Sequence, residues 1–345
     1  MTRPRLGFFT RLLDDAPAAD RYRNAIDQVV HAEQLGYDTA WVAQHHFHSG
    51  EGGLPSPFVL LAQAAARTSR IVLATGIVTL PLEAPVRVAE DAAVLHVLAD
   101  GRFELGIGSG GTPSSFAPFG QDAGRRPEIY AAHKAALLRA LRGEALTADG
   151  GALYPAAPQL VDALWEATFS AGGAARIGGE GNGLMLSRTQ PRTEWTGRGS
   201  APDQVPIVDA YEAALPPGRA PRVMASRSVL VVDTETEARR WRARGIARSL
   251  PMLAAQHVEV PQHASDEEVA AFLDLHVGTP EQVLAGLSAD PVLTRATDVV
   301  FQPHPVDPPH EVVLRSLELI AGRVAPALGW SPLHRPQELA GRTAS

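Results

Sequence analysis

The feature that most constrains the fold is a repeated alternation of short apolar runs with helical segments. Runs rich in apolar and β-branched residues are typical of parallel strands that are buried on both faces. They lie at 6–10, 41–45, 71–78, 102–107, 164–169, 184–187, 222–232 and 298–301. Helical patterns lie at 20–35, 56–67, 85–98, 127–142 and 311–328. Eight strands alternating with helices over 345 residues predict an α/β fold, a single (β/α)8 barrel of the TIM type.

Two segments do not fit the alternation, and we interpret them as insertions after strands six and seven. The segment 188–205 is polar and rich in Gly, Pro and Arg, which predicts a mobile loop. The segment 249–277 predicts an insertion with one amphipathic helix at 266–275. We therefore expect one barrel domain over 1–330 and a C-terminal tail over 331–345.

Composition excludes several classes of function. The chain is 45% hydrophobic and 20% charged, enough for a substantial core, and its net charge of −7 argues against nucleic acid and anionic membranes as partners. It contains no cysteine, which excludes disulfides, thiolate nucleophiles and Cys-ligated metals. Lys134, the one lysine, falls in a predicted helix. Without an apolar run of membrane-spanning length, we expect a cytoplasmic protein.

A polar cluster follows directly on the apolar part of the second strand. It consists of Gln44, His45, His46 and His48, and in α/β barrels the chemistry lies at such carboxyl ends. Because imidazole titrates near neutral pH, His45 is a candidate for moving protons. The alternative is a histidine that only bonds a neighbouring loop. His46 and His48 have the spacing of metal ligands, but no convincing set of further ligands can be placed at other strand ends, so we predict no metal site.

Glycine-rich turns follow strands four and five, and both are candidate anion sites. Backbone amides of Ser109, Gly110 and Gly111 can approach an anion closely. The stronger candidate is the helix start after strand five, where a hydroxyl, amide hydrogens and a guanidinium meet the positive end of the helix dipole. Its residues are Ser170, Gly172, Gly173, Ala174 and Arg176. Plain loop geometry is the alternative for both turns.

Several strings in this chain resemble those of one known family. They are AEQLGYDTAW at 32–41, QHHF at 44–47, ATGIVTLPLEAPVRVAED at 74–91, DGRFELGIG at 100–108 and VGTPEQV at 277–283. In order and spacing they resemble the bacterial-luciferase-like flavin-dependent monooxygenases. Further strings, EGGLPSP at 51–57, ATFS at 167–170 and LMLSRTQP at 184–191, resemble a subgroup of FMN-dependent luciferase-like monooxygenases.

The resemblance implies an enzyme that uses reduced FMN and dioxygen to oxygenate a small organic substrate. A separate flavin reductase would supply the reduced FMN, and the chain would form a homodimer through the helices after strands two and three. A deazaflavin-dependent hydride-transfer oxidoreductase on the same fold stays open as an alternative. A non-catalytic flavin-binding protein and a metal-dependent hydrolase are further alternatives. The sequence does not identify the organic substrate.

The resemblance also assigns roles to single residues. His45 corresponds to the active-site histidine of the family, and Gln44 either contacts the flavin or fills the barrel mouth. A bend, often a non-prolyl cis peptide beside the flavin ring, is implied at Thr75, Gly76 and Ile77. Many relatives carry an arginine for the FMN phosphate where this chain has Ser109.

Residues after strands six and eight complete the set of candidates. Arg188 follows strand six, where it either binds flavin or an acidic substrate or is a solvated loop charge. His304 follows strand eight, as a candidate substrate contact or as part of a proline-rigid turn. Four tryptophans are interpreted as packing or amphipathic surface residues: Trp41, Trp165, Trp195 and Trp241.

Overall fold

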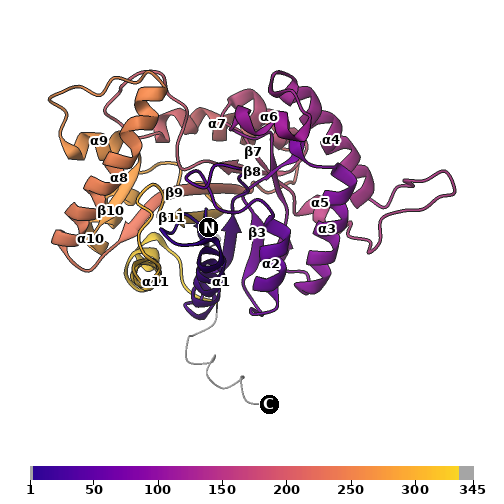
Figure 1. Cartoon of the computed structure of the whole chain (residues 1–345), viewed down its shortest axis with the longest axis horizontal. Helices are drawn as coiled ribbons and strands as arrows, with labels where there is room; N and C mark the ends of the chain where they lie inside the picture. The colour runs from indigo at the N-terminus through magenta and orange to yellow at the C-terminus, as the bar shows by residue number, and fades with distance from the viewer. Residues whose placement is uncertain (1–2, 334–345) are drawn as a thin grey trace, which may run out of the picture.

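The computed structural model describes residues 3–333, and its strands form one parallel sheet curled into a barrel. The strands are β1 (Arg5–Thr10), β2 (Thr39–Val42), β3 (Val72–Thr75), β4 (Val78–Thr79), β5 (Phe103–Glu104), β6 (Gly106–Gly108), β7 (Trp165–Ala167), β8 (Gly183–Leu186), β9 (Val223–Val231), β10 (Leu275–Gly278) and β11 (Asp298–Gln302). Figure 1 shows the sheet at the centre with helices around it, and β10 to the left beside α8 and α10.

The strand pairing closes into a ring. β3 and β4 are the two halves of one strand that is broken at 76–77, and β5 and β6 are the halves of the next. β3 pairs with β5 and β4 with β6, and the ring continues through β7, β8, β9, β11, β1 and β2 back to β3. Within the described residues this makes eight barrel strands, so the predicted (β/α)8 barrel is confirmed. β10 pairs with the far half of β9, outside the ring.

The helices cover the outside of the ring. They are α1 (Ala18–Gln34), α2 (Pro57–Ala65), α3 (Pro85–Leu98), α4 (Arg126–Leu141), α5 (Gln159–Asp162), α6 (Ala171–Gly179), α7 (Ala201–Ala214), α8 (Glu235–Ala255), α9 (Asp266–Phe272), α10 (Pro280–Ser288) and α11 (His310–Leu319). None of the helices within residues 3–333 is long and apolar enough to cross a membrane. The segment between α4 and α5 protrudes from the body (Figure 1).

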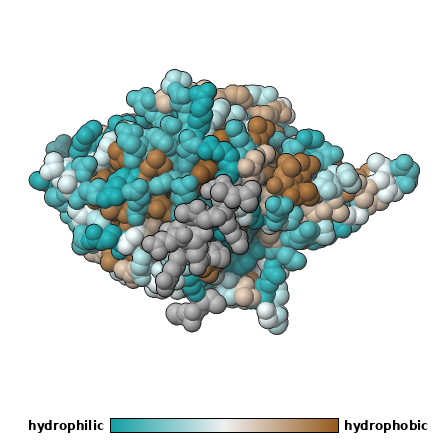
Figure 2. Space-filling model, turned by 90° about the horizontal axis from the view of Figure 1, so that it is seen from below, coloured by the Kyte–Doolittle hydropathy of each residue, from teal (hydrophilic) through white to brown (hydrophobic). Residues whose placement is uncertain are grey.

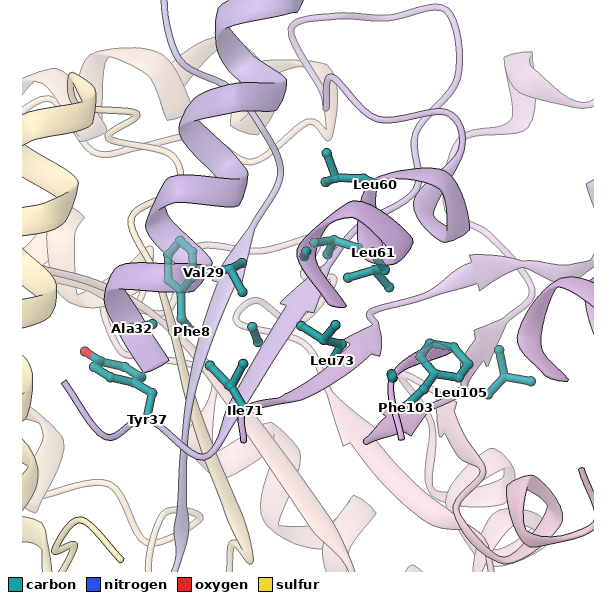
Figure 3. Close-up of a cluster of buried hydrophobic side chains, with 14 of the residues drawn as sticks. Phe8, Val29, Ala32, Tyr37, Leu60, Leu61, Ile71, Leu73, Phe103 and Leu105 are labelled. Carbon is teal, nitrogen blue, oxygen red and sulfur yellow. The ribbon is translucent and has the colours of Figure 1, made fainter. Parts of the chain in front are cut away.

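The main core lies between the strands and the surrounding helices. Figure 3 shows part of it, where Val29 and Ala32 of α1 and Leu61 of α2 face Leu73 of β3 and neighbouring strand residues. These side chains are at most a few per cent exposed, and burial of this kind contributes about 1.5–3 kcal/mol for each large apolar side chain. The apolar runs that predicted the strands thus supply the outward-facing half of this core.

The inside of the barrel is filled in layers. A middle layer of apolar side chains includes Trp41 and Trp165, whose rings meet edge to face at 5.7 Å. Below it, at the start of the strands, Arg5 bridges Glu104 at 2.7 Å and Asp298 at 2.6 Å. This ion-paired plug closes the barrel at the amino ends of its strands, which leaves the carboxyl ends as the open mouth.

The structure corrects several predicted boundaries. The second strand ends at Val42, so Gln44 and His45 lie just beyond the strand. The third strand is not continuous over 71–78 but breaks at 76–77. The last residues of the predicted loop 188–205 already belong to α7, and 275–278 forms β10 instead of ending a helix.

Of the remaining sequence-based expectations, the roles of the tryptophans are confirmed, whereas the segment before the last strand contains an unexpected strand. Trp41, Trp165 and Trp241 are buried packing residues, and Trp195 stacks on Phe272 at 4.5 Å, as their interpretation requires. The segment between β9 and β11 contains the strand β10 in addition to the helices α8, α9 and α10. Of the C-terminal tail predicted over 331–345, residues 334–345 lie outside the described residues.

Candidate active site

Polar side chains gather at the mouth, beyond the carboxyl ends of five neighbouring strands. Arg11 follows β1, His45 follows β2 and Arg188 follows β8. β9 contributes Ser228, and the segment after β11 contributes His304 and Asp307. In a parallel barrel this is the end where reactive groups from different strands can meet.

Arg11 and His45 form the shortest polar contact of this group. The guanidinium Nη2 lies 2.7 Å from Nε2 of His45. Because a guanidinium can only donate, Nε2 must accept, and the ring proton of the neutral imidazole lies on Nδ1. The backbone of Gly52 packs against the other side of the ring, where an added Cβ would lie 2.4 Å from Nδ1. The imidazole is therefore held in one orientation and one tautomer.

Burial and two cations keep His45 uncharged. Burial, followed by the nearby charge of Arg11, lowers the pKa of His45 to about 3. Its Nδ1 is buried and has no hydrogen-bond partner among the described residues. A neutral imidazole with an unpaired N–H is suited to donate a hydrogen bond. The proton-transfer role expected from the usual pKa of histidine is therefore replaced by that of a hydrogen-bond donor.

Gln44 has a structural role that the sequence left undecided. Its Nε2 donates to Oε1 of Glu83 at 2.7 Å and to the carbonyl of Pro55, and its Oε1 accepts from the amide of Thr79 at 2.7 Å. These bonds satisfy both ends of the buried amide. Gln44 therefore ties the end of β2 to β4, and contact with a flavin stays a prediction.

Arg188 is buried at the end of β8. Its side chain is 7% exposed, and its hydrogen bond within the described residues goes from Nη1 to Oγ of Ser228 at 3.3 Å. Burial, and then the charge of Arg11, lower the pKa of Arg188 to about 9. The alternative of a solvated loop charge is wrong, because the guanidinium faces the interior of the mouth.

His304 and Asp307 form a second buried pair, beside β11. Nδ1 of His304 lies 2.9 Å from Oδ1 of Asp307, and Arg248 of α8 lies 3.0 Å from Oδ2. Burial raises the pKa of Asp307 to about 6 and, together with the charge of Arg188, holds the pKa of His304 well below its usual value. The bond between His304 and Pro305 is cis. Both roles considered for His304 are compatible with this geometry.

The other half of the mouth, beyond β4, β6 and β7, is lined by small residues. The peptide between Gly76 and Ile77 is cis, as the resemblance implied. A Cβ on Gly76 would lie 2.5 Å from the ring of Phe9, so only glycine fits there. Thr75 turns its hydroxyl to Gly106, accepting from its amide and donating to its carbonyl at 2.9 Å. Gly76 and Ile77 are partly exposed at this edge of the interior.

Of the two glycine-rich turns, the one after β7 keeps free amides. Ser170 caps α6 by accepting from the amide of Gly173 at 3.1 Å, and Ala174 donates to the carbonyl of Ser170. The amides of Gly173 and Ala174 are thus already used, which corrects their predicted availability to an anion. Ala171 and Gly172 lie exposed in the first turn, where backbone amides have no partner within the helix.

The turn after β6 is held by neighbouring residues. Gly110 has a φ of +80°, and a Cβ there would lie 2.4 Å from Thr79. Its carbonyl accepts from Arg126 at 2.9 Å. Ser109 precedes it and is partly exposed. A phosphate contact at Ser109 or Gly110 stays a prediction.

Arg176 lies away from the helix start on which its predicted role depends. Its guanidinium pairs with Glu166 of β7 at 3.0 Å and with Glu180 at 3.3 Å. Glu166 is fully buried and also binds Lys134 at 2.6 Å. These ion pairs lie outside the barrel, between β7, α4 and α6, so the structure gives Arg176 a packing role where the sequence predicted a phosphate ligand.

The histidines considered as metal ligands are separated from each other. The ring of His46 packs against Phe119 at 4.8 Å, and His48 reaches Ser114 at 3.2 Å. Within residues 3–333 no group of three or more suitable side chains has the geometry of a metal site.

Sequence reasoning missed Arg11, Ser228 and Asp307. Arg11 directly follows a predicted strand, so its position at a strand end was a usable signal. Ser228 lies inside a long apolar run, and Asp307 lies in a proline-rich turn. Neither of these two has a local pattern that predicts its side-chain partner.

Comparisons with known proteins extend these observations. A model of the luciferase-like monooxygenase family matches residues 6–295. An uncharacterized protein, y4vJ, of Sinorhizobium fredii is 34% identical over 188 residues, 52% of this chain and 53% of that protein. The 4-hydroxyprotoasukamycin monooxygenase of Streptomyces nodosus is 46% identical over 90 residues, 26% of this chain and 24% of that enzyme. The chain thus spans about a quarter to about half of the length of these relatives.

Solved structures share the fold over nearly the whole chain. The oxygenating component of 3,6-diketocamphane monooxygenase from Pseudomonas putida, in complex with FMN, has a TM-score of 0.74 at 18% identity, covering 94% of this chain and 99% of that chain. An F420-dependent secondary alcohol dehydrogenase has a TM-score of 0.66 at 16% identity, covering 95% and 99%. At these identities the likeness concerns the fold.

Fold and site together define a parallel α/β barrel with its polar site at the carboxyl ends of the strands. The match over residues 6–295 makes the assignment more specific: the chain belongs to the luciferase-like monooxygenase family.

Proposed function

We propose that this protein is a two-component flavin-dependent monooxygenase that uses reduced FMN and dioxygen to oxygenate a small organic substrate. The observation that carries the proposal is the buried, neutral His45 held by Arg11 at the mouth of a barrel of this family. Relatives named as monooxygenases support it, as does the FMN bound to the diketocamphane enzyme on the same fold.

The part of the mouth beyond β4, β6 and β7, which is lined by small residues, fits a planar flavin ring. Gly76 and Ile77 are partly exposed at the inner edge, and no side chain extends from Gly76. The exposed amides of Ala171 and Gly172 and the hydroxyl of Ser170 would hold the phosphate at the positive end of α6. When bound, reduced FMN supplies the electrons for activating dioxygen.

His45 acts on the substrate side of this arrangement. Its Nδ1–H is the donor that Arg11 leaves without a partner among the described residues. A hydrogen bond of this kind orients a reacting group and stabilises charge that develops on oxygen. Water must be excluded while the reaction proceeds, and loop 188–200 lies beside the mouth where it would serve as a cover.

An anaerobic titration followed by an oxygen pulse tests the function. Reduced FMN should bind, and dioxygen should then produce a transient flavin absorbance that differs from oxidised FMN. Hydride transfer with a deazaflavin is the second candidate, favoured by the likeness to the F420-dependent dehydrogenase. If a reduced deazaflavin is turned over without oxygen while reduced FMN does not bind, the monooxygenase proposal fails.

We also propose that the chain forms a homodimer and receives reduced FMN from a separate reductase. The helices α2 and α3 carry exposed apolar side chains: Val59, Val86, Val94, Val97 and Leu98. Figure 2 shows apolar (brown) surface beside the grey atoms on one face of the molecule. Burial of such a surface against its copy would remove it from water.

A further inference from the structure

Two arginines of the mouth lack a carboxylate partner. Within the described residues, the side chain of Arg11 bonds the neutral imidazole of His45, and that of Arg188 bonds the hydroxyl of Ser228. Neither forms an ion pair with an acid of residues 3–333. A guanidinium taken out of water without a counter-ion is costly, so such a pair is typical of a site that receives an anion.

The acid nearest to them is already engaged. Asp307 accepts from His304 at 2.9 Å and lies 3.0 Å from Arg248. Burial raises the pKa of Asp307 to about 6, so Asp307 still carries most of its negative charge at pH 7, but this one carboxylate faces three guanidiniums, those of Arg11, Arg188 and Arg248. The mouth therefore carries an excess of positive charge in a chain whose net charge is −7.

Polar atoms of Arg11 and of a residue that lines the same cavity also lack partners. Nε of Arg11 and Oε1 of Gln302 are buried and form no hydrogen bond within the described residues. Both side chains line one small cavity between the ends of β1 and β11. Gln302 is held by its Nε2, which donates to Oγ of Ser226 at 2.8 Å. Buried polar atoms are nearly always paired, so unpaired ones beside a cavity point to a missing polar ligand.

This group occupies the arc of the ring from β8 to β1, which adjoins the arc of the predicted flavin contacts. Gly76, Ser109 and Ser170 follow the adjacent strands β3, β6 and β7, whereas Arg188 and Arg11 follow β8 and β1 on either side of β9 and β11. The two guanidiniums therefore flank the part of the mouth that the flavin contacts leave for a second molecule.

We propose that Arg11 and Arg188 together bind a carboxylate of the organic substrate and so restrict the enzyme to substrates that carry one. A carboxylate matches the planar fork of a guanidinium and can accept from both arginines at once. Because Arg11 also orients His45, the same residue would place the substrate next to the donor on Nδ1. That the bound acid is also the molecule that is oxygenated rests on the proposed function.

Calorimetry with two matched pairs of probes tests the site. Benzoate is compared with benzamide, and hexanoate with hexanamide, because each pair keeps its shape and differs in charge. The parent should bind the carboxylates at least about tenfold more tightly than the amides, the ratio expected of a charge-assisted contact. Arg188→Gln should lose this preference. Arg295→Gln, which removes a guanidinium already paired with Asp209 and Glu212, should keep it. Equal binding of acid and amide in both pairs, or an unchanged preference in Arg188→Gln, overturns the proposal.

A parallel titration with oxidised and reduced FMN separates this site from the flavin site. Reduction places negative charge on the flavin ring, so the ring is the other anion that the arginines could receive. We expect Arg188→Gln to leave both FMN affinities within about twofold of the parent. A selective loss of reduced FMN, without a carboxylate preference in the parent, assigns the arginines to the flavin and overturns the proposal. Carboxylate preference without FMN binding removes the proposed function and leaves the anion site standing.

Discussion

Arg11 donates a hydrogen bond to Nε2 of His45 across 2.7 Å, and this contact fixes which ring nitrogen carries the proton. The two residues follow neighbouring strands, β1 and β2, which pair in parallel. The register of that pair therefore decides the chemistry of the imidazole. A histidine that was singled out for its pKa in water is uncharged here, with its proton on Nδ1.

Removal of His45 should impair oxygenation far more than flavin binding. A positioned hydrogen-bond donor to developing charge contributes roughly 100- to 1,000-fold in rate, so His45→Ala should lose about that much turnover. Affinity for reduced FMN should change little, because the predicted phosphate contacts lie across the mouth. Single-turnover rates and anaerobic titration measure the two effects. His46→Ala should be milder, since its ring packs on Phe119. Loss of activity in His46→Ala, with stoichiometric zinc or iron in the pure protein, would favour the metal hydrolase instead.

The depressed pKa of His45 predicts a pH dependence of stability. His45 has a pKa of about 3 in the folded protein and about 6.5 when unfolded, so the unfolded chain binds the extra proton between these values. Stability is thus present above pH 6.5 and is lost as the pH falls toward 3, with a slope approaching about 1.4 kcal/mol per pH unit. Denaturant unfolding of the parent and His45→Gln between pH 7 and 5 measures it. Asp298 and Asp307, whose pKa values are raised to about 6, act in the opposite direction in both proteins. Parallel curves for the two proteins would contradict this prediction.

Arg176 offers a test between packing and phosphate binding. Because its guanidinium pairs with the buried Glu166, Arg176→Ala should lower the free energy of unfolding by about 1–2 kcal/mol. The dissociation constant of FMN should stay within about threefold, since the remaining amides and hydroxyl of the turn are untouched. Thermal unfolding and flavin titration measure both. A tenfold weaker binding of FMN with unchanged stability would restore the phosphate role.

The loop before α7 is anchored through Asp274. Its carboxylate accepts from the amide of Ser200 at 2.9 Å and pairs with Arg192 at 3.2 Å. We expect Asp274→Ala to release the loop, so that limited proteolysis nicks 188–200 faster than in the parent. Asp209→Ala, which removes an exposed partner of Arg295, is the matched control. In the parent, flavin with substrate should slow the nicking. Equal rates with and without these ligands would leave the segment an inert surface loop.

The proposed dimer should depend on the exposed face of α3. Leu98 is 58% exposed and Val97 is 56% exposed. A charge at either position would have to be buried without a partner, so Leu98→Glu should yield a monomer. Light scattering coupled to size-exclusion chromatography measures the mass. Val59→Glu on α2 should act in the same direction. A monomeric parent would refute the proposal directly.

The order of strands could be predicted from the sequence, because buried parallel strands leave a local apolar pattern. The position of His45 followed from the same pattern. The contacts of Arg11, Arg188 and Asp307 could not be predicted, since they join side chains of different elements (β1 with β2, β8 with β9, and the segment after β11 with α8), and a local apolar pattern does not give the direction of a polar side chain. The break between β3 and β4 lies inside a continuous apolar run, where Gly76 is the one local sign of it. Only the family resemblance indicated the break. Arg176 was misplaced by treating a residue of the second helical turn as part of the helix start.

The plug of Arg5, Glu104 and Asp298 has a consequence for the order of events in catalysis. In the proposed function, the ion-paired amino ends leave the carboxyl ends of the strands as the shared route for flavin, oxygen, substrate and product. A bound substrate would block the entry of a bulky flavin. A small acid could still enter beside a flavin that lies against the strand ends of β4, β6 and β7. For the proposed monooxygenase, one shared route would favour an order in which the flavin enters first and the oxygenated product leaves before the oxidised flavin is exchanged.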